Sequence, residues 1–216
     1  MTIVRGSRIA ALGAVLTLMA TPAPAAAAEA AVPDAARPFR CPTARLDGLT
    51  PAQAEAAGAA LKDVCAILAS DAFQARLRAG TWLTGCPVAP WSRANRIGGG
   101  EGLARLSEGV PDFTHQAEKA GWSSTIAMTD VANRTMRIRP GWFDHAASPD
   151  RAVRALFLNT LAHEMTHLVS PPGRPGAYQF TDSRYWLPWC GRDRMFSYGV
   201  GDLVAAAWLE ASGRAD

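Results

Sequence analysis

Two histidines four residues apart, His163 and His167, and the glutamate that follows the first of them, Glu164, form the pattern HExxH in this 216-residue chain. On a helix, residues four apart lie on one face, so both imidazoles could bind a single tetrahedral Zn²⁺. The Glu164 carboxylate would lie about 100° around the helix, close enough to accept a proton from a zinc-bound water. These residue types at this spacing predict a hydrolytic zinc site with Glu164 as general base.

The sequence around this pattern independently predicts a helix from Pro149 to about Val169. Ser148 is the expected N-cap, and Pro149 suits the first helical position. The run ends at the Ser-Pro-Pro-Gly sequence 170–173. Apolar residues recur through it at spacings of three and four, namely Val153, Leu156, Phe157, Leu161, Met165 and Leu168. Both histidines therefore fall in the last turns of a helix. The alternative is that they are ordinary polar residues of that helix, and the intact triplet favours zinc.

A hydrolytic zinc site needs a third protein ligand and an open fourth position. No histidine follows His167, because His115 and His145 both precede the motif. Those two histidines are expected at the surface or in a supporting role. The third ligand should therefore be a downstream carboxylate, and the candidates are Asp182, Asp193, Asp202 and Glu210. Without a metal, Asp182 could instead cap a turn, and Asp202 could stabilise the first turn of a helix.

The stretch Thr181–Tyr185 reads T-D-x-x-Y and resembles the second motif of the aspzincins, the deuterolysin-like zinc metallopeptidases. The run Ile138–Phe143, before the predicted helix, also resembles that family's approach to its site. The resemblance implies that Asp182 is the third zinc ligand and that Tyr185 assists catalysis, for instance by stabilising the oxyanion. Asp202 stays the alternative ligand, because it begins a predicted helix and the gluzincins complete their site with a Glu on a later helix.

The remaining elements predict an α+β fold, a zincin-like metallopeptidase domain with N-terminal helices, a small antiparallel sheet and the HExxH helix. Helices are expected from Pro51 to about Leu68 and from Asp71 to Arg78. The glycine-rich segment Thr81–Gly109 is expected to be loop. Two short runs, Thr125–Thr129 and Thr135–Arg139, predict a hairpin. In zinc peptidases the edge strand beside the site pairs with the substrate backbone, so the resemblance implies that one of these strands binds substrate.

Residues 1–28 have the pattern of a secretory signal peptide. Arg5 and Arg8 precede an apolar stretch of about a dozen residues, and a Pro/Ala-rich segment with A-x-A cleavage sites follows. An uncleaved anchor is the alternative, but the apolar stretch is short for a membrane span. We expect export, no stable membrane insertion after cleavage, a disordered lead-in over 29–40, and a single domain over 41–216.

Charge and cysteine content narrow the class further. Removing the leader with its two arginines reduces the 22 basic residues to 20 against 19 acidic ones. The sequence has no basic run interleaved with aromatics, which predicts no nucleic-acid partner. Four cysteines in an exported chain predict two disulfides, with three possible pairings of Cys41, Cys65, Cys86 and Cys190. If all four pair, one bridge must join Cys190 to the N-terminal half of the chain.

These features together predict a secreted or periplasmic zinc-dependent endopeptidase that binds one zinc ion and acts on a protein or peptide. Two alternatives remain open at this stage. The first is a cell-wall peptide or amide hydrolase that uses the same zinc site. The second is an exported binding protein without catalysis. The oligomeric state has no signature in the sequence.

Overall fold

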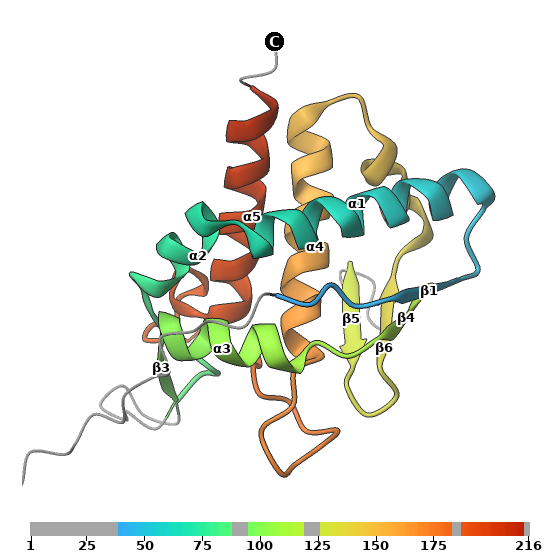
Figure 1. Cartoon of the computed structure of the whole chain (residues 1–216). Coiled ribbons are helices and arrows are strands. Elements are labelled where there is room, and N and C mark those ends of the chain that lie inside the picture. Colours follow the sequence, from blue (N-terminus) through green and yellow to red (C-terminus); the bar gives the residue numbers. More distant parts are fainter. Residues whose placement is uncertain (1–38, 88–94, 119–125, 183–186, 214–216) are drawn as a thin grey trace, which may run out of the picture. The chain divides into compact units, whose positions relative to one another are not determined.

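Four strands form a mixed sheet in the computed structural model of this chain (Figure 1). The residues that the structure describes are 39–87, 95–118, 126–182 and 187–213. In order of pairing, the strands are β1 (Ala44–Asp47), β4 (Phe113–Ala117), β6 (Thr135–Ile138) and β5 (Ala127–Asp130). The first three are parallel to one another, and β5 pairs antiparallel with β6 at the edge.

The α+β class and the β5–β6 hairpin are therefore confirmed, whereas the prediction of an antiparallel sheet is wrong. Two strands of this sheet that the sequence did not reveal, β1 and β4, are short and pair in parallel with each other, and β4 also pairs in parallel with β6. A parallel pair needs a long crossover between its strands, so no local hairpin signal marks it. The parallel part of this sheet comes from contacts between distant segments.

The two N-terminal helices begin where the sequence predicts, and each starts at a side-chain cap. Helix α1 (Pro51–Ala69) starts with a capping box, in which Thr50 and Gln53 each bond the other's backbone N–H. Helix α2 (Asp71–Arg78) starts at Ser70, whose hydroxyl accepts the Phe73 N–H. The α1 residues buried in the core recur at helical spacing, namely Ala57, Ala60, Leu61, Val64, Cys65 and Leu68.

Helices α4 (Arg151–His167) and α5 (Phe196–Ser212) run side by side in opposite directions, and α1 lies across them (Figure 1). Helix α4 begins later than predicted, because its N-cap is Asp150 rather than Ser148. The Asp150 carboxylate accepts the backbone N–H groups of the first helical turn. A 3₁₀ helix, η1 (Pro140–Ala147), ends just before this point. A second one, η2 (Arg192–Arg194), leads into α5.

The segment predicted as loop, 81–109, instead contains β2 (Thr81–Leu83), β3 (Arg96–Gly98) and helix α3 (Gly99–Gly109). Strands β2 and β3 form a separate antiparallel pair. The glycines misled the prediction because two of them serve close packing. A Cβ at Gly99 would lie 1.8 Å from the Leu77 carbonyl oxygen, and one at Gly102 would lie 2.3 Å from the Phe196 ring.

Two disulfides are present, as predicted, and they join Cys41 to Cys65 and Cys86 to Cys190. The second bridge connects Cys190, which follows the HExxH helix, to the N-terminal half of the chain. Disulfides are typical of proteins that mature in an oxidising compartment. The predicted signal peptide and most of the predicted lead-in lie outside the described residues.

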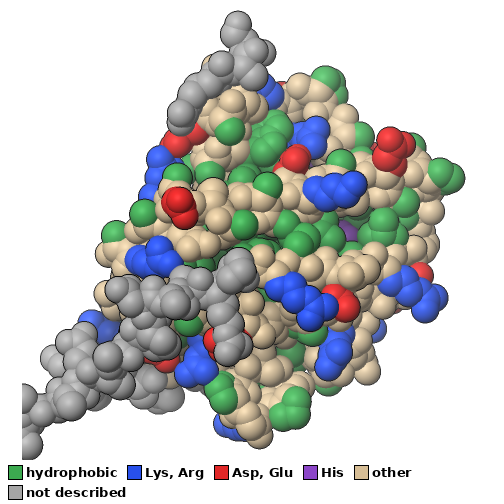
Figure 2. Space-filling view, viewed as in Figure 1, with side chains coloured by type: hydrophobic (Ala, Val, Ile, Leu, Met, Phe, Trp, Pro, Cys, Tyr) green, Lys and Arg blue, Asp and Glu red, His purple; other side chains and the backbone are tan. Residues whose placement is uncertain are grey.

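On the face shown in Figure 2, Lys and Arg side chains of the described residues lie among acidic, apolar and other groups rather than in one patch. Among the helices that the structure describes, none is long and apolar enough to cross a membrane. The core reaches back to Phe39, the first described residue, which is 8% exposed.

Candidate metal centre

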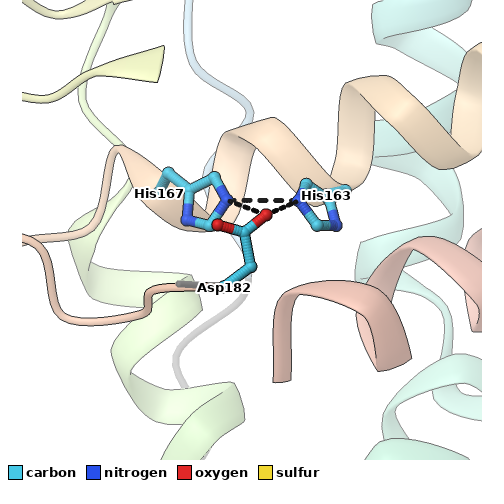
Figure 3. A group of neighbouring side chains, drawn as sticks. All are labelled: His163, His167 and Asp182. Carbon is cyan, nitrogen blue, oxygen red and sulfur yellow. Dashed lines mark hydrogen bonds and ion pairs between the residues drawn. The ribbon is translucent and has the colours of Figure 1, made fainter. Parts of the chain in front are cut away.

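The structure brings His163, His167 and Asp182 together at the C-terminal end of α4 (Figure 3). The two histidines lie on adjacent turns and are 7% and 6% exposed. Their Nε2 atoms are 3.2 Å apart. Asp182 comes from the segment after α4, and its Oδ2 lies 3.2 Å from the His163 Nε2 and 3.7 Å from the His167 Nε2. Within the described parts of the chain, this is a group of three possible ligands that converge on one point.

These separations fit a tetrahedral zinc ion. With ligand bonds of about 2.0–2.2 Å, two ligand atoms at tetrahedral positions lie roughly 3.3–3.6 Å apart. The three measured separations, from 3.2 to 3.7 Å, fall close to that interval. Two imidazoles and one carboxylate are also the donor types of hydrolytic zinc sites with three protein ligands. The residues present therefore suit Zn²⁺ in both chemistry and spacing.

A hydrogen bond fixes which nitrogen of His167 is free to bind. The Nδ1 of His167 lies 2.9 Å from the Phe180 carbonyl oxygen, so it donates its proton there and leaves the Nε2 lone pair facing Asp182. Phe180 is fully buried and stacks on Phe196, with ring centroids 4.1 Å apart. The apolar anchor of this segment thus orients a proposed ligand.

The segment that carries Asp182 is held by two backbone hydrogen bonds just before this residue. The Gln179 N–H donates to the Val169 carbonyl at 3.0 Å, which returns the chain to the end of α4. The Thr181 N–H donates to the Thr84 carbonyl at 2.7 Å, just after β2. Asp182 therefore directly follows an anchored stretch of backbone.

The ligand group is strongly coupled electrostatically. Burial raises the pKa of Asp182, but its hydrogen bonds and charge interactions with His163 and His167 outweigh this and hold that pKa well below its usual range. Burial lowers the pKa of His167, and the interactions with Asp182 and Glu164 outweigh it, so that this pKa is raised. Protons and a metal ion would compete for the same nitrogen, so metal binding should release protons.

Glu164 points into a cleft of about 430 Å³ beside the ligand group. Its carboxylate Oε2 accepts a hydrogen bond of 2.7 Å from the hydroxyl of Thr129 on β5. The cleft is lined by β5, by Glu164, His167 and Asp182, and by Tyr178 from the segment after α4. The Glu164 carboxylate, the three possible metal ligands and an edge strand therefore open onto the same space.

The other residues singled out in the sequence lie elsewhere. Tyr185 falls outside the described residues. Asp202 is exposed on α5, where its carboxylate accepts a 2.8 Å hydrogen bond from Asn159. Asp193 is exposed in η2, and Glu210 forms a two-pronged salt bridge with Arg76.

The two remaining histidines, His115 on β4 and His145 in η1, are not among the ligand group. The expectation of a surface position is wrong for His115, which is 2% exposed on β4 and whose ring contacts two phenylalanine rings. His145 is half-buried in η1 and contacts the Trp142 ring at 4.0 Å. His115 is therefore a core residue of the sheet rather than a surface residue.

Three residues of the site were not foreseen. Thr129 was within the predicted hairpin, and the alternation of that strand could have placed it on the buried face. Tyr178 lines the cleft, and the centroid of its ring lies 6.2 Å from that of the His167 ring. Tyr198, at the start of α5, meets the His163 ring at 4.4 Å. Neither tyrosine belongs to a periodic pattern, so no local signal connected them with the motif.

Comparisons of this chain with models of protein families, with curated proteins and with solved structures gave no match.

Proposed function

We propose that this protein is an exported zinc-dependent peptidase that hydrolyses peptide bonds in the cleft between β5 and α4. The observation that carries the proposal is the convergence of His163, His167 and Asp182 beside the carboxylate of Glu164. A structural metal site would need no carboxylate free of the metal next to an open cleft. The two disulfides agree with export, because they suit an oxidising compartment.

In this proposal, His163, His167 and Asp182 hold one zinc ion. When bound, the ion would polarise the substrate carbonyl and lower the pKa of water, so that the water gives up a proton more readily as it attacks. Glu164 accepts a proton from the attacking water, whose oxygen bonds to the carbonyl carbon. Glu164 then donates that proton to the nitrogen of the leaving amine as the carbon–nitrogen bond breaks. The same carboxylate therefore acts first as base and then as acid.

A donor is also needed for the oxyanion that develops on the substrate. The resemblance to the aspzincins assigns this role to Tyr185. Tyr178 is a second candidate, because it lines the cleft and contacts His167. Burial raises the pKa of Tyr178, so its phenol keeps its proton at neutral pH. In the structure the Tyr178 hydroxyl donates to the Thr129 carbonyl, so it would have to exchange that bond for the oxyanion.

The edge strand β5 supports an extended peptide as the substrate. The Arg139 N–H donates to the Ile126 carbonyl, which marks that pair as hydrogen-bonded. In an antiparallel ladder such pairs alternate, so the backbone N–H and C=O of Ala127 and Thr129 face away from β6. Both residues line the cleft. The Thr129 C=O already accepts the Tyr178 hydroxyl, so a peptide strand could pair with this edge through Ala127 and the Thr129 N–H while its scissile bond lies over the ligand group.

The test is hydrolysis of casein by the mature protein with zinc bound. Glu164→Gln keeps the shape of the side chain but removes the base, so zinc content should stay near that of the wild type. Its kcat should fall by about a hundred-fold or more. Glu55→Gln, on the exposed face of α1, is the matched control and should behave like the wild type.

Unchanged hydrolysis by Glu164→Gln would contradict the mechanism. A parallel digest of purified peptidoglycan separates a protein-directed peptidase from a cell-wall peptide hydrolase that uses the same site. If the zinc-loaded wild type hydrolyses neither substrate, the exported binding protein becomes the better account.

A further inference from the structure

We propose that Thr129 is the positioning residue for the general base: its hydroxyl holds the Glu164 carboxylate in the orientation that proton transfer requires. This inference rests on the proposed peptidase function and extends it to a residue outside the HExxH motif. It follows from one contact between the edge strand β5 and helix α4, and from the way in which both partners of that contact are held.

The contact itself is short and directed. The Thr129 Oγ1 lies 2.7 Å from Oε2 of Glu164 and 3.2 Å from the backbone oxygen of the same residue. A hydroxyl has one proton to donate, and the shorter distance to a charged acceptor assigns that proton to the carboxylate. Both side chains are buried, Thr129 at 5% and Glu164 at 6% exposure. Little water therefore competes for the bond.

The donor is more rigid than the acceptor. Threonine is branched at Cβ, which restricts its χ1 torsion, whereas a glutamate carboxylate ends three rotatable bonds. The backbone of Thr129 is also held on both sides. It lies opposite Met136 of β6 in the sheet register, and its carbonyl oxygen accepts a 2.5 Å hydrogen bond from the Tyr178 hydroxyl. A fixed donor thus restrains a flexible base.

This restraint has a direct consequence for proton transfer. With Oε2 engaged by Thr129, the other carboxylate oxygen of Glu164 is left for the proton of the attacking water. A general base must lie within hydrogen-bond reach of that proton, and a misplacement of about 1 Å can cost roughly a hundred-fold in rate. Thr129 lies on the strand that would pair with substrate. The backbone of β5 would therefore position both the general base and the substrate.

Thr129→Val tests the inference because it keeps the branched shape and removes the hydroxyl. We expect its kcat for a casein-derived peptide to fall by about ten- to a hundred-fold, with KM and zinc content near the wild-type values. Thr129→Ser restores the hydroxyl on a less restricted side chain, so it should recover most of the lost rate. In a Glu164→Gln background, Thr129→Val should cause no further loss, because the base is already absent.

Ser197→Ala is the matched control for the loss of a buried hydroxyl bond to the same helix. The Ser197 hydroxyl is 2.8 Å from that of Thr166, and Ser197 is 1% exposed. Ser197→Ala should lower the free energy of unfolding about as much as Thr129→Val does, and it should leave kcat within about two-fold of wild type. Thr129→Val with wild-type kcat, while Glu164→Gln is inactive, would overturn the positioning role alone.

Equal losses in Thr129→Val and Thr129→Ser would also overturn the positioning role, because they would show that shape rather than the hydroxyl matters. If the zinc-loaded wild type hydrolyses no substrate, the peptidase function fails and the positioning role fails with it. The two failures can be distinguished. Failure of the peptidase function appears as an inactive wild type, whereas failure of the positioning role alone leaves the wild type active.

Discussion

His115 shows what burial does to a titratable side chain in this fold. It lies on β4 with ring contacts to Phe113 and Phe143, and within the described residues its Nε2 has no hydrogen-bond partner. Burial lowers the pKa of His115 to about 4. The usual value for an unfolded chain is about 6.5, so between these two values the unfolded chain binds more protons than the folded one.

The stability of the protein should therefore fall as the pH drops from about 6.5 to 4. The contribution of His115 is fully present above about pH 6.5 and decreases by up to roughly 3 kcal/mol at the lower pH. In His115→Phe, which keeps an aromatic ring among the two phenylalanines, the free energy of unfolding should depend less on pH in this interval. Urea unfolding of both proteins at several pH values measures this. Equal pH slopes would show that His115 does not carry the effect.

Individual site residues differ in how far the sequence could predict them. His163 and His167 form a local pattern, because ligands four apart on one helix need no knowledge of the fold. Their convergence with Asp182 depends on Phe180, which is buried in the core two residues before Asp182. A buried phenylalanine in the sequence does not indicate a metal site. Thr129 reaches Glu164 across 35 positions of the chain, and only the packing of a strand against the helix joins them.

At the scale of elements, helices with caps and apolar periodicity were predictable, and elements built by distant contacts were not. Helices α1 and α2 have side-chain caps at Thr50 and Ser70, which can be read locally. Helix α3 has no side-chain cap and contains several glycines, so its sequence favours a loop. Its buried residues Leu103 and Leu106 and its tight packing against Leu77 and Phe196 explain why it is helical.

Two glycines of α3 should respond in opposite ways to alanine. Gly100→Ala should stabilise the protein by about 0.5–1 kcal/mol, because a Cβ there meets nothing within 4 Å and alanine favours the helix. Gly102→Ala should destabilise it by about 1–3 kcal/mol, because its Cβ would meet the buried Phe196 ring. Denaturant unfolding measures both. A stabilising Gly102→Ala would contradict the close packing of α3 against α5.

At the scale of the whole molecule, the described part of the chain forms one compact unit in which the site draws on several distant segments. Helix α4 provides two of the proposed ligands and the proposed base, β5 provides the edge strand, and the segment after α4 provides Asp182. The Cys86–Cys190 bridge closes a sequence separation of 104 residues around these parts. Cross-links over long separations restrict the unfolded chain most, so this bridge should help to keep the parts of the site together.

The most direct measurement of the central claim is the zinc content of the untagged mature protein after dialysis against a weak chelator. We predict about one zinc per chain, bound through His163, His167 and Asp182. Asp182→Ala should weaken zinc binding by at least about a hundred-fold, since even the outer partners of ligands contribute ten- to a hundred-fold. Asp202→Ala should bind like the wild type. Absence of zinc after zinc is offered, or full zinc binding by Asp182→Ala, would contradict the proposed site.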